Sequence, residues 1–276
     1  VYKRQGLPCF ISSGDGELAS YTSLGVRFAD DWTSDWELDV VRCANLDSVE
    51  VNLPRIAFAA AGNDESFLES LSDMLDVAAK ALAIKQSIMR KRVEQRLLPM
   101  FAHKAGGEPY LRLENSLMHI GLVGLAEAVK QHTSFYPHES DDALTFAKRV
   151  LDYAAKHLTE RFPQKRVVVG LSHSVEAAQR MAELDLERHG AAIATSLGTK
   201  KHPCYSIDPA TYLSDSPDVE KWASVSGLVQ RLTPGGHFSA ISTFLELEDL
   251  VALTKSVCLE GGVKFFAYGR LLTYCR

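Results

Sequence analysis

Short apolar runs alternate with long amphipathic patterns along this chain, and this alternation restricts the fold more than any other feature. Apolar residues recur at helical spacing from Asp64 to about Arg96, from about Ser140 to Phe162, and from about Ser174 to His189. Before, between and after these patterns lie short runs rich in β-branched and aromatic residues, namely VEVNL, RVVVGL, FSAIST and VKFFAY. Strands that alternate with helices predict an α/β architecture with a largely covered sheet.

The domain organisation follows from the same patterns. Asp64 is the expected N-cap of the first helix, and Gly190 is expected to close the third. Residues 1–45 are rich in Gly, Ser and Asp without a long period, which predicts loops with short extended pieces. No repeat or low-complexity linker divides the rest. We therefore expect one domain over 1–276, with a loop region at 1–45 and a strand and helix body at 46–276.

The composition argues against several classes of function. The chain has 276 residues, of which 46% are apolar and 24% charged, so it can bury a substantial core. Its net charge of −5 gives no general reason to expect nucleic-acid binding. No run approaches the roughly 18 apolar residues of a membrane span, and no secretory signal is visible. The five scattered cysteines form no CxxC pair, which argues against a disulfide framework and favours the reducing cytoplasm.

Asn52 ends an apolar strand, and Pro54 and Arg55 follow it almost at once and are expected to turn the backbone. A buried amide costs free energy unless its hydrogen bonds are made. Asn52 is therefore either tied to its own loop or directed at a group that needs both a donor and an acceptor.

A strand, a tight polar turn and a helix follow one another at 166–182. Ser172, His173 and Ser174 fall where the first free N–H groups of the helix would point outward, and such a terminus is a typical anion site. Alternatively, the Ser174 hydroxyl and nearby Glu176 simply cap the helix. The two interpretations are compatible.

Gly235 and Gly236 precede the short strand FSAIST, with His237 directly after them. Glycines at this place allow close approach of the backbone to a ligand or to another strand, although a plain turn would also use them. The patterns HxxxH, HExxH, GxSxG, GxxxxGK[ST] and GxGxxG are absent from the sequence. This argues against the usual metal hydrolases, serine hydrolases, P-loop proteins and dinucleotide-binding proteins.

Taken in order, six blocks resemble the anaerobic, or class III, ribonucleoside-triphosphate reductases of the glycyl radical superfamily. VEVNLPRIAF is similar to the family's VTINLPRIAY, and five more blocks follow over nearly the whole chain: GLVGLAEAV, HESDDAL, SHSVEAAQRMAELDLERHG, TPGGHFSAI and FFAYGRLLTYC. The resemblance implies a ten-stranded α/β barrel that encloses a finger loop, with this chain as its C-terminal part. It also implies radical reduction of ribonucleotides to deoxyribonucleotides in an anaerobic cell.

The resemblance gives roles to several residues. Asn52 matches the family's Asn that hydrogen-bonds the ribose hydroxyls, so we expect it to point into the barrel lumen near the loop from Leu24 to Arg27. The turn from Ser172 to Ser174 matches the segment that receives the substrate phosphates. The remaining candidates for substrate binding are Leu24, Gly25, Gly235 and Gly236.

The chain departs from the family at the radical-carrying position. The family's thiyl radical forms on a finger-loop cysteine in a block like SMGCRF, whereas this chain has SLGVRF, which puts Val26 at the cysteine position. A valine has no S–H bond to cycle. We therefore expect the isolated chain not to be competent, with Cys43 as an alternative candidate for the radical.

The implied cofactors and partners lie largely outside this chain. They are a glycyl radical, installed by an iron–sulfur and S-adenosylmethionine activase, and a structural zinc whose first ligand Cys275 resembles. Expected partners are ribonucleoside triphosphates, the remaining portion of the reductase, the activating protein and, in the full-length family, a second copy. Both ends of the chain look cut from a longer protein. The alternative function is a non-catalytic nucleotide-binding or assembly module derived from the same barrel.

Overall fold

Three parallel strands form the centre of the computed structural model: β4 (Asn45–Asn52), β7 (Leu117–Val123) and β8 (Val167–Leu171). The central strand β7 pairs with both neighbours, and Glu50, Gly121 and Gly170 lie side by side across the sheet. The structure describes residues 9–12, 19–22, 25–29, 33–163, 166–190, 197–199, 201–213, 218–242, 247–259 and 261–269.

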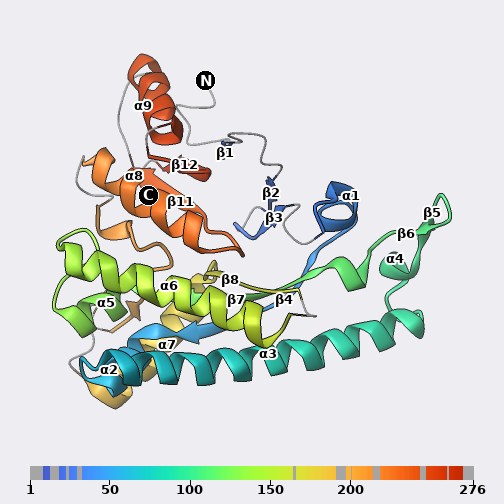
Figure 1. Ribbon diagram of the computed structural model, residues 1–276, viewed down its shortest axis with the longest axis horizontal. Helices are drawn as coiled ribbons and strands as arrows, with labels where there is room; N and C mark the ends of the chain where they lie inside the picture. Colours follow the sequence, from blue (N-terminus) through green and yellow to red (C-terminus); the bar gives the residue numbers. More distant parts are fainter. Residues whose placement is uncertain are drawn as a thin grey trace, which may run out of the picture.

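Helices cover one face of this sheet. The two long helices, α3 (Asp64–Glu94) and α6 (Asp141–Arg161), pack side by side against it (Figure 1). Alternate residues of the strands, among them Ile120 and Leu122 of β7, join the apolar core formed with these helices. The strand period of two therefore leaves the opposite face to Ser48, Glu50, His119 and Gly121.

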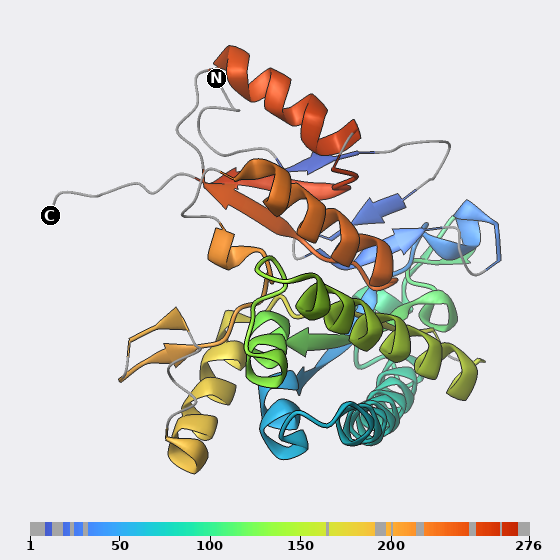
Figure 2. The ribbon, with the colours of Figure 1, turned by 60° about the vertical axis from the view of Figure 1, so that its left-hand side comes forward.

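A second small sheet continues the first. It pairs β11 (Ser239–Ser242) with the parallel β12 (Phe265–Gly269) and β12 with the antiparallel β1 (Phe10–Ile11). The helices α8 (Val219–Leu232) and α9 (Leu247–Leu259) lie against it (Figure 2). The backbone N–H of Gly235 donates to the Val169 carbonyl at 2.7 Å, so the chain before β11 runs along β8. The two sheets thus form an open arc, as expected for part of a barrel.

Shorter elements connect these parts. The helices α2 (Leu53–Ala60), α5 (Leu125–Thr133) and α7 (Val175–His189) follow β4, β7 and β8 respectively. The remaining elements are β2 (Ala19–Tyr21), β3 (Arg27–Ala29), α1 (Trp36–Asp39), α4 (Pro99–Ala102), β5 (Lys104–Ala105), β6 (Glu108–Pro109), η2 (Leu113–Asn115), β9 (Leu197–Gly198), β10 (Pro203–Cys204) and η4 (Thr211–Leu213).

The α/β prediction, the three long helices and the four predicted strands are confirmed. One predicted cap is wrong, because the Asn63 side chain, not that of Asp64, accepts from the Ser66 N–H at 2.9 Å. The expected turn after Asn52 is instead a helix, since proline is tolerated in the first helical turn. The central strand β7 was not among the predicted runs.

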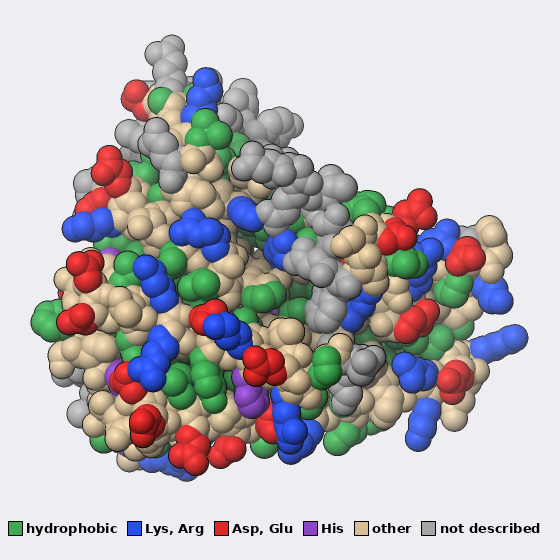
Figure 3. Space-filling view, viewed as in Figure 1, with side chains coloured by type: hydrophobic (Ala, Val, Ile, Leu, Met, Phe, Trp, Pro, Cys, Tyr) green, Lys and Arg blue, Asp and Glu red, His purple; other side chains and the backbone are tan. Residues whose placement is uncertain are grey.

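Three further observations concern the helices, the cysteines and the surface. None of the helices within the described ranges is long and apolar enough to cross a membrane. The four cysteines that the structure describes are free. Acidic and basic side chains are interspersed over the face shown in Figure 3.

Replacing Ile120 by Ala should lower the free energy of unfolding by about 2–5 kcal/mol, because the side chain is fully buried in the central strand and its loss leaves a cavity. The matched control is Ile84→Ala on α3, where the side chain is 62% exposed and the expected change is below about 1 kcal/mol. Urea unfolding followed by circular dichroism measures both. Equal effects would contradict the placement of β7 in the core.

Candidate functional site

The carboxyl end of β4 is tied to α7 by a buried carboxylate. The Asn52 Nδ2 donates to Asp185 Oδ2 at 2.8 Å, and Arg55 Nε donates to Asp185 Oδ1 at 2.7 Å. The Tyr205 hydroxyl donates to the same carboxylate at 3.0 Å. Because Asp185 is fully buried, these donors replace its water and hold α7 across the end of the sheet.

Asn52 is therefore engaged on both sides of its amide. Its Oδ1 accepts from the Arg55 N–H at 3.1 Å and caps α2, while its Nδ2 bonds to Asp185. The first alternative that the sequence left open is realised, since the amide oxygen serves its own turn, and the amide nitrogen also reaches a distant partner that only accepts. This partner is a protein carboxylate.

The expected proximity of Asn52 to the loop around Val26 is not observed. Asn52 pairs with Val123 at the carboxyl end of β7, whereas Val26 packs with Leu117 and Val168 at the amino ends of β7 and β8. Leu117 and Val123 are six positions apart on β7, so roughly 20 Å of strand lies between them.

The turn before α7 is capped as the sequence indicated. The Ser174 Oγ accepts from the Ala177 N–H at 3.1 Å, and the buried Ser172 Oγ accepts from the Ser174 N–H at 3.1 Å. The first turn of α7 thus begins directly at the carboxyl end of β8. In open α/β sheets, ligands bind at such strand ends.

Val26, the expected finger-loop position, lies in an apolar cluster. Val26 is 2% exposed and packs with Phe28, Leu117 and Val168, and Cys43 packs against the same cluster. Burial raises the pKa of the Cys43 thiol, which therefore stays protonated at neutral pH.

The glycines before β11 approach other backbone segments closely. The Gly235 carbonyl accepts from the Arg27 N–H at 3.0 Å, and the Gly236 carbonyl accepts from the Leu171 N–H at 3.3 Å. Gly236 has a φ of 90°, which a side chain would strain, and a Cβ there would overlap the Gly25 carbonyl. The two glycines therefore lie close to the backbone of β8 and to the segment at 25–27. After them, His237 Nε2 lies 3.2 Å from Asp208 Oδ1.

Two residues on the inner face of the sheet were missed by sequence reasoning. Glu50 lies two positions before Asn52 on the same side of β4, and His119 is buried on β7. Burial lowers the pKa of His119 to about 3, so its ring is neutral at pH 7, and burial raises the pKa of Glu50. The signal for His119 was available, because it interrupts the otherwise apolar β7, whereas β4 carries several other polar residues, so Glu50 did not stand out.

Glu127 on α5 is a second buried carboxylate at this end of the sheet. It accepts from the Ser206 N–H at 2.6 Å, the Ser206 hydroxyl at 2.7 Å and the Tyr212 hydroxyl at 2.8 Å. Burial raises the pKa of Glu127, and these hydrogen bonds oppose that shift. The contacts fix the segment after β10 against α5.

Two predicted site residues, Leu24 and Cys275, lie outside the described residues. In the described ranges, no group of three or more His, Cys, Asp and Glu is arranged to hold a metal ion. The donors that the structure describes therefore do not fit a zinc site.

Comparisons with known proteins find one family model and several solved structures that are similar to this chain. The family model for the anaerobic ribonucleoside-triphosphate reductase matches residues 4–276. The crystal structure of the anaerobic ribonucleotide reductase from Thermotoga maritima in complex with dATP and CTP matches with a TM-score of 0.69 and 22% identity, over 83% of this chain and 37% of that chain. The structure of the Thermotoga maritima reductase with glycerol in the active site matches with a TM-score of 0.67 and 22% identity, over 80% and 35%.

This chain therefore spans little more than a third of the length of these structures. At this identity they show the fold alone. No curated protein matches the sequence significantly.

Asp185→Ala should destabilise the protein by about 3 kcal/mol, because it leaves the Asn52 amide, the Arg55 guanidinium and the Tyr205 hydroxyl without their acceptor. Asp152→Ala, which removes an exposed ion pair with Lys156, is the control and should change stability by less than about 1 kcal/mol. Chemical denaturation of the two variants gives the comparison. A small effect at Asp185 would show that the packing of α7 against the carboxyl end of β4 does not depend on this carboxylate.

Proposed function

The chain belongs to the anaerobic ribonucleoside-triphosphate reductase family, and from this premise we propose that it forms part of the nucleotide-binding barrel of such a reductase. The members of this family are glycyl radical enzymes and oxidoreductases. Because the chain spans only about a third of the reductases it matches, its substrates and the activity of the whole protein are part of the proposal. The substrates would be ribonucleoside triphosphates, reduced to deoxyribonucleotides in the cytoplasm of an anaerobic cell.

The observation that carries this proposal is the first turn of α7 at the carboxyl end of the parallel sheet. Its N–H groups and the helix dipole favour negative charge, and Ser172 to Ser174 shape the turn in front of them. The substrate phosphates would bind there. The Thermotoga maritima reductase has been solved in complex with dATP and CTP, which supports nucleotide binding as a proposal for this chain.

Catalytic competence depends on the position of Val26. A buried valine in an apolar cluster offers no S–H bond for hydrogen transfer, so this chain as it stands would bind nucleotide without reducing it. This burial favours the second candidate function, a non-catalytic nucleotide-binding or assembly module. In both cases the remaining portion of a reductase, its activating protein and a second copy of the protein would be the partners.

The implied cofactors do not enter this proposal. The glycyl radical would be supplied by chemistry outside this chain, and the zinc would need ligands that the described residues do not provide.

ATP should bind more tightly than adenosine, because the helix terminus attracts the phosphates and not the base. Val175→Asp at the exposed first position of α7 should weaken ATP binding by about tenfold or more, since it places a carboxylate beside the phosphates. Val175→Asn is the matched neutral control. Titration calorimetry of the unaltered protein and of the two variants gives the affinities for ATP and adenosine. Equal affinities of the unaltered protein for the two ligands would contradict the phosphate site.

Val26→Cys should be necessary for ribonucleotide reduction when the remaining portion of a reductase and its activating enzyme are supplied under strict anaerobiosis. The physical reason is that only a thiol can donate and regain a hydrogen atom at this position. Deoxyribonucleotide formation is the measurement, and Val26→Ser, of similar size but without a thiol, is the control. Turnover by the unaltered chain would show that another cysteine, such as Cys43, carries the radical.

A further inference from the structure

The long helix α3 carries an apolar stripe that nothing in the described chain covers. Its buried side chains end at Leu82 and face the sheet and α6. On a neighbouring side of the helix, Met74, Val77, Ile84 and Ile88 are each between 44% and 62% exposed. Large apolar side chains aligned on one side of a helix indicate a surface that another element covers.

The spacing of this stripe is that of a coiled-coil seam. With the half-buried Ala81 included, the positions are 74, 77, 81, 84 and 88, which follow one another in alternating steps of three and four residues. Two helices pack along each other through this a and d pattern. We call these five residues the α3 seam. The seam extends over about 21 Å of helix.

The C-terminal part of α3 has little support from the rest of the described chain. No side chain from Ala83 to Glu94 is buried there. Figure 1 shows this end of the helix running out beyond the sheet toward α4. Most of the stability of a helix in a protein comes from the packing of its apolar face. A partner along Ile84 and Ile88 would supply that packing.

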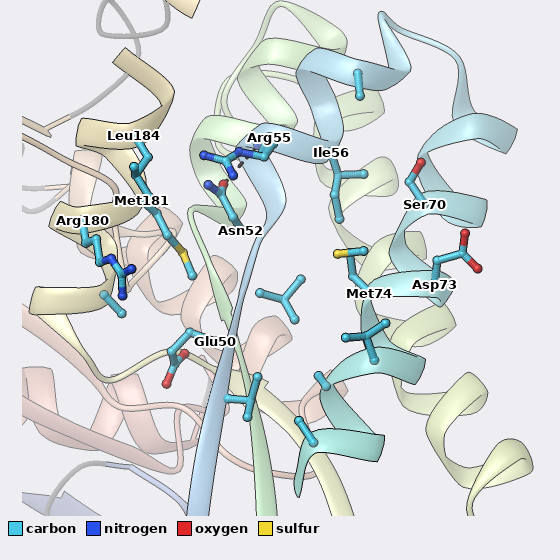
Figure 4. Close-up of a pocket in the computed structure, with 17 residues that line it drawn as sticks. Glu50, Asn52, Arg55, Ile56, Ser70, Asp73, Met74, Arg180, Met181 and Leu184 are labelled. Atoms are coloured by element: carbon cyan, nitrogen blue, oxygen red, sulfur yellow. Dashed lines mark hydrogen bonds between the residues drawn. The ribbon is translucent and has the colours of Figure 1, made fainter. Parts of the chain in front are cut away.

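The other end of the seam borders an open groove. The groove has a volume of about 680 Å³ and lies between α3 and α7 along β4, the edge strand of its sheet in the described chain. Figure 4 shows Met74 directed from α3 toward β4, with Met181 and Leu184 on the α7 side. Val77 also lines the groove. The seam is therefore accessible to a partner over its whole length.

The charges of α3 favour one partner. The charged residues from Asp64 to Asp76 are all acidic, whereas those from Lys80 to Arg92 are all basic. The helix dipole favours this order only in the first and last turns. Two parallel copies of α3 would place like charges together, whereas two antiparallel copies place the acidic part of each against the basic part of the other. The pattern is thus complementary to itself.

We propose that two copies of this chain associate through the α3 seam, with the two helices antiparallel about a twofold axis between Ala81 and Ile84. This axis pairs Ala81 with Ile84 and Val77 with Ile88 across the interface. Each copy then presents the same surface to the other, as a closed dimer requires. The inference goes beyond the proposed function and does not depend on nucleotide binding.

The same axis predicts a specific pair of charges. Asp73 and Arg92 lie at equal distances from it along the helix, so Asp73 of each copy lies opposite Arg92 of the partner subunit. Both side chains are exposed, and within the described ranges neither forms an ion pair. On one helix they are 19 positions apart, or about 28 Å, which is too far for direct contact.

The first test is sedimentation velocity of the intact chain over a series of concentrations. The unaltered protein should change from monomer to dimer as the concentration rises. Val77→Lys should weaken the association at least about tenfold, because the burial of a valine is lost and a charge enters the seam. Val251→Lys, the same exchange at an exposed position of α9, is the matched control and should leave the association unchanged.

The second test exchanges the predicted charges. Asp73→Lys and Arg92→Glu should each weaken the dimer about threefold or more, because each places like charges opposite each other at two symmetric positions. The double variant Asp73→Lys/Arg92→Glu should restore the affinity of the unaltered protein. Since the two residues do not touch within one helix, recovery requires the antiparallel contact between copies.

The outcomes decide the inference in either direction. A chain that stays monomeric at every concentration would overturn it and leave the seam to the remaining portion of a reductase. A dimer that persists unweakened in Val77→Lys would overturn it as well. A dimer that the double variant does not restore would overturn the antiparallel pairing. The concentration series on the unaltered protein does not depend on the folding of any variant.

Discussion

The buried carboxylate of Asp185 is the interaction on which the carboxyl end of the sheet depends. It collects donors from two separate segments, through Asn52 and Arg55 at the start of α2 and Tyr205 in the loop after β10, and so joins three segments, the third being α7 itself. A fully buried carboxylate is stable only when its oxygens are satisfied, so the three segments cannot move independently. The position of α7, and with it the proposed phosphate site, follows from this constraint. Glu127 acts in the same way on the neighbouring loop.

The two faces of the central sheet differ because their physical tasks differ. On the helix-covered face, Ile120 and Leu122 join a continuous apolar core. On the other face, Gly121 and Gly170 lie side by side in the middle of the sheet, and a Cβ on either would collide with Glu50 or His119. Glycine weakens a strand, so two of them in adjacent strands indicate that space on this face matters more than strand propensity. Polar side chains fill that space.

The packing around Val26 is separable from the chemistry proposed for this position. Val26 packs in a small apolar cluster, and packing there requires only an apolar side chain of suitable size, which a valine or a cysteine provides. The finger loop is held by backbone bonds from Arg27 to Gly235 and by the tight contact of Gly25 with Phe238. The loop can therefore keep its place in the fold whether or not residue 26 carries sulfur.

The sequence by itself determined the elements with strong periodicity. The three long helices and four strands follow from spacing and from caps such as Ser174, because these signals act within a few residues. The sequence marked Gly235 and Gly236 as a place for either close approach or a plain turn, and the structure shows close approach. The family resemblance rested on blocks of sequence in the same way.

Only the tertiary structure decided which polar residues meet. Asp185 lies in an amphipathic helix among charged residues, yet it is fully buried and bonds to Asn52, which is 133 positions away in the sequence. The helix after Asn52 was mistaken for a turn because proline is permitted in both. Glu50 was not recognised from the sequence, because the position of its carboxylate depends on Gly121 in the next strand. Such contacts join segments far apart in the chain, and local spacing carries no information about them.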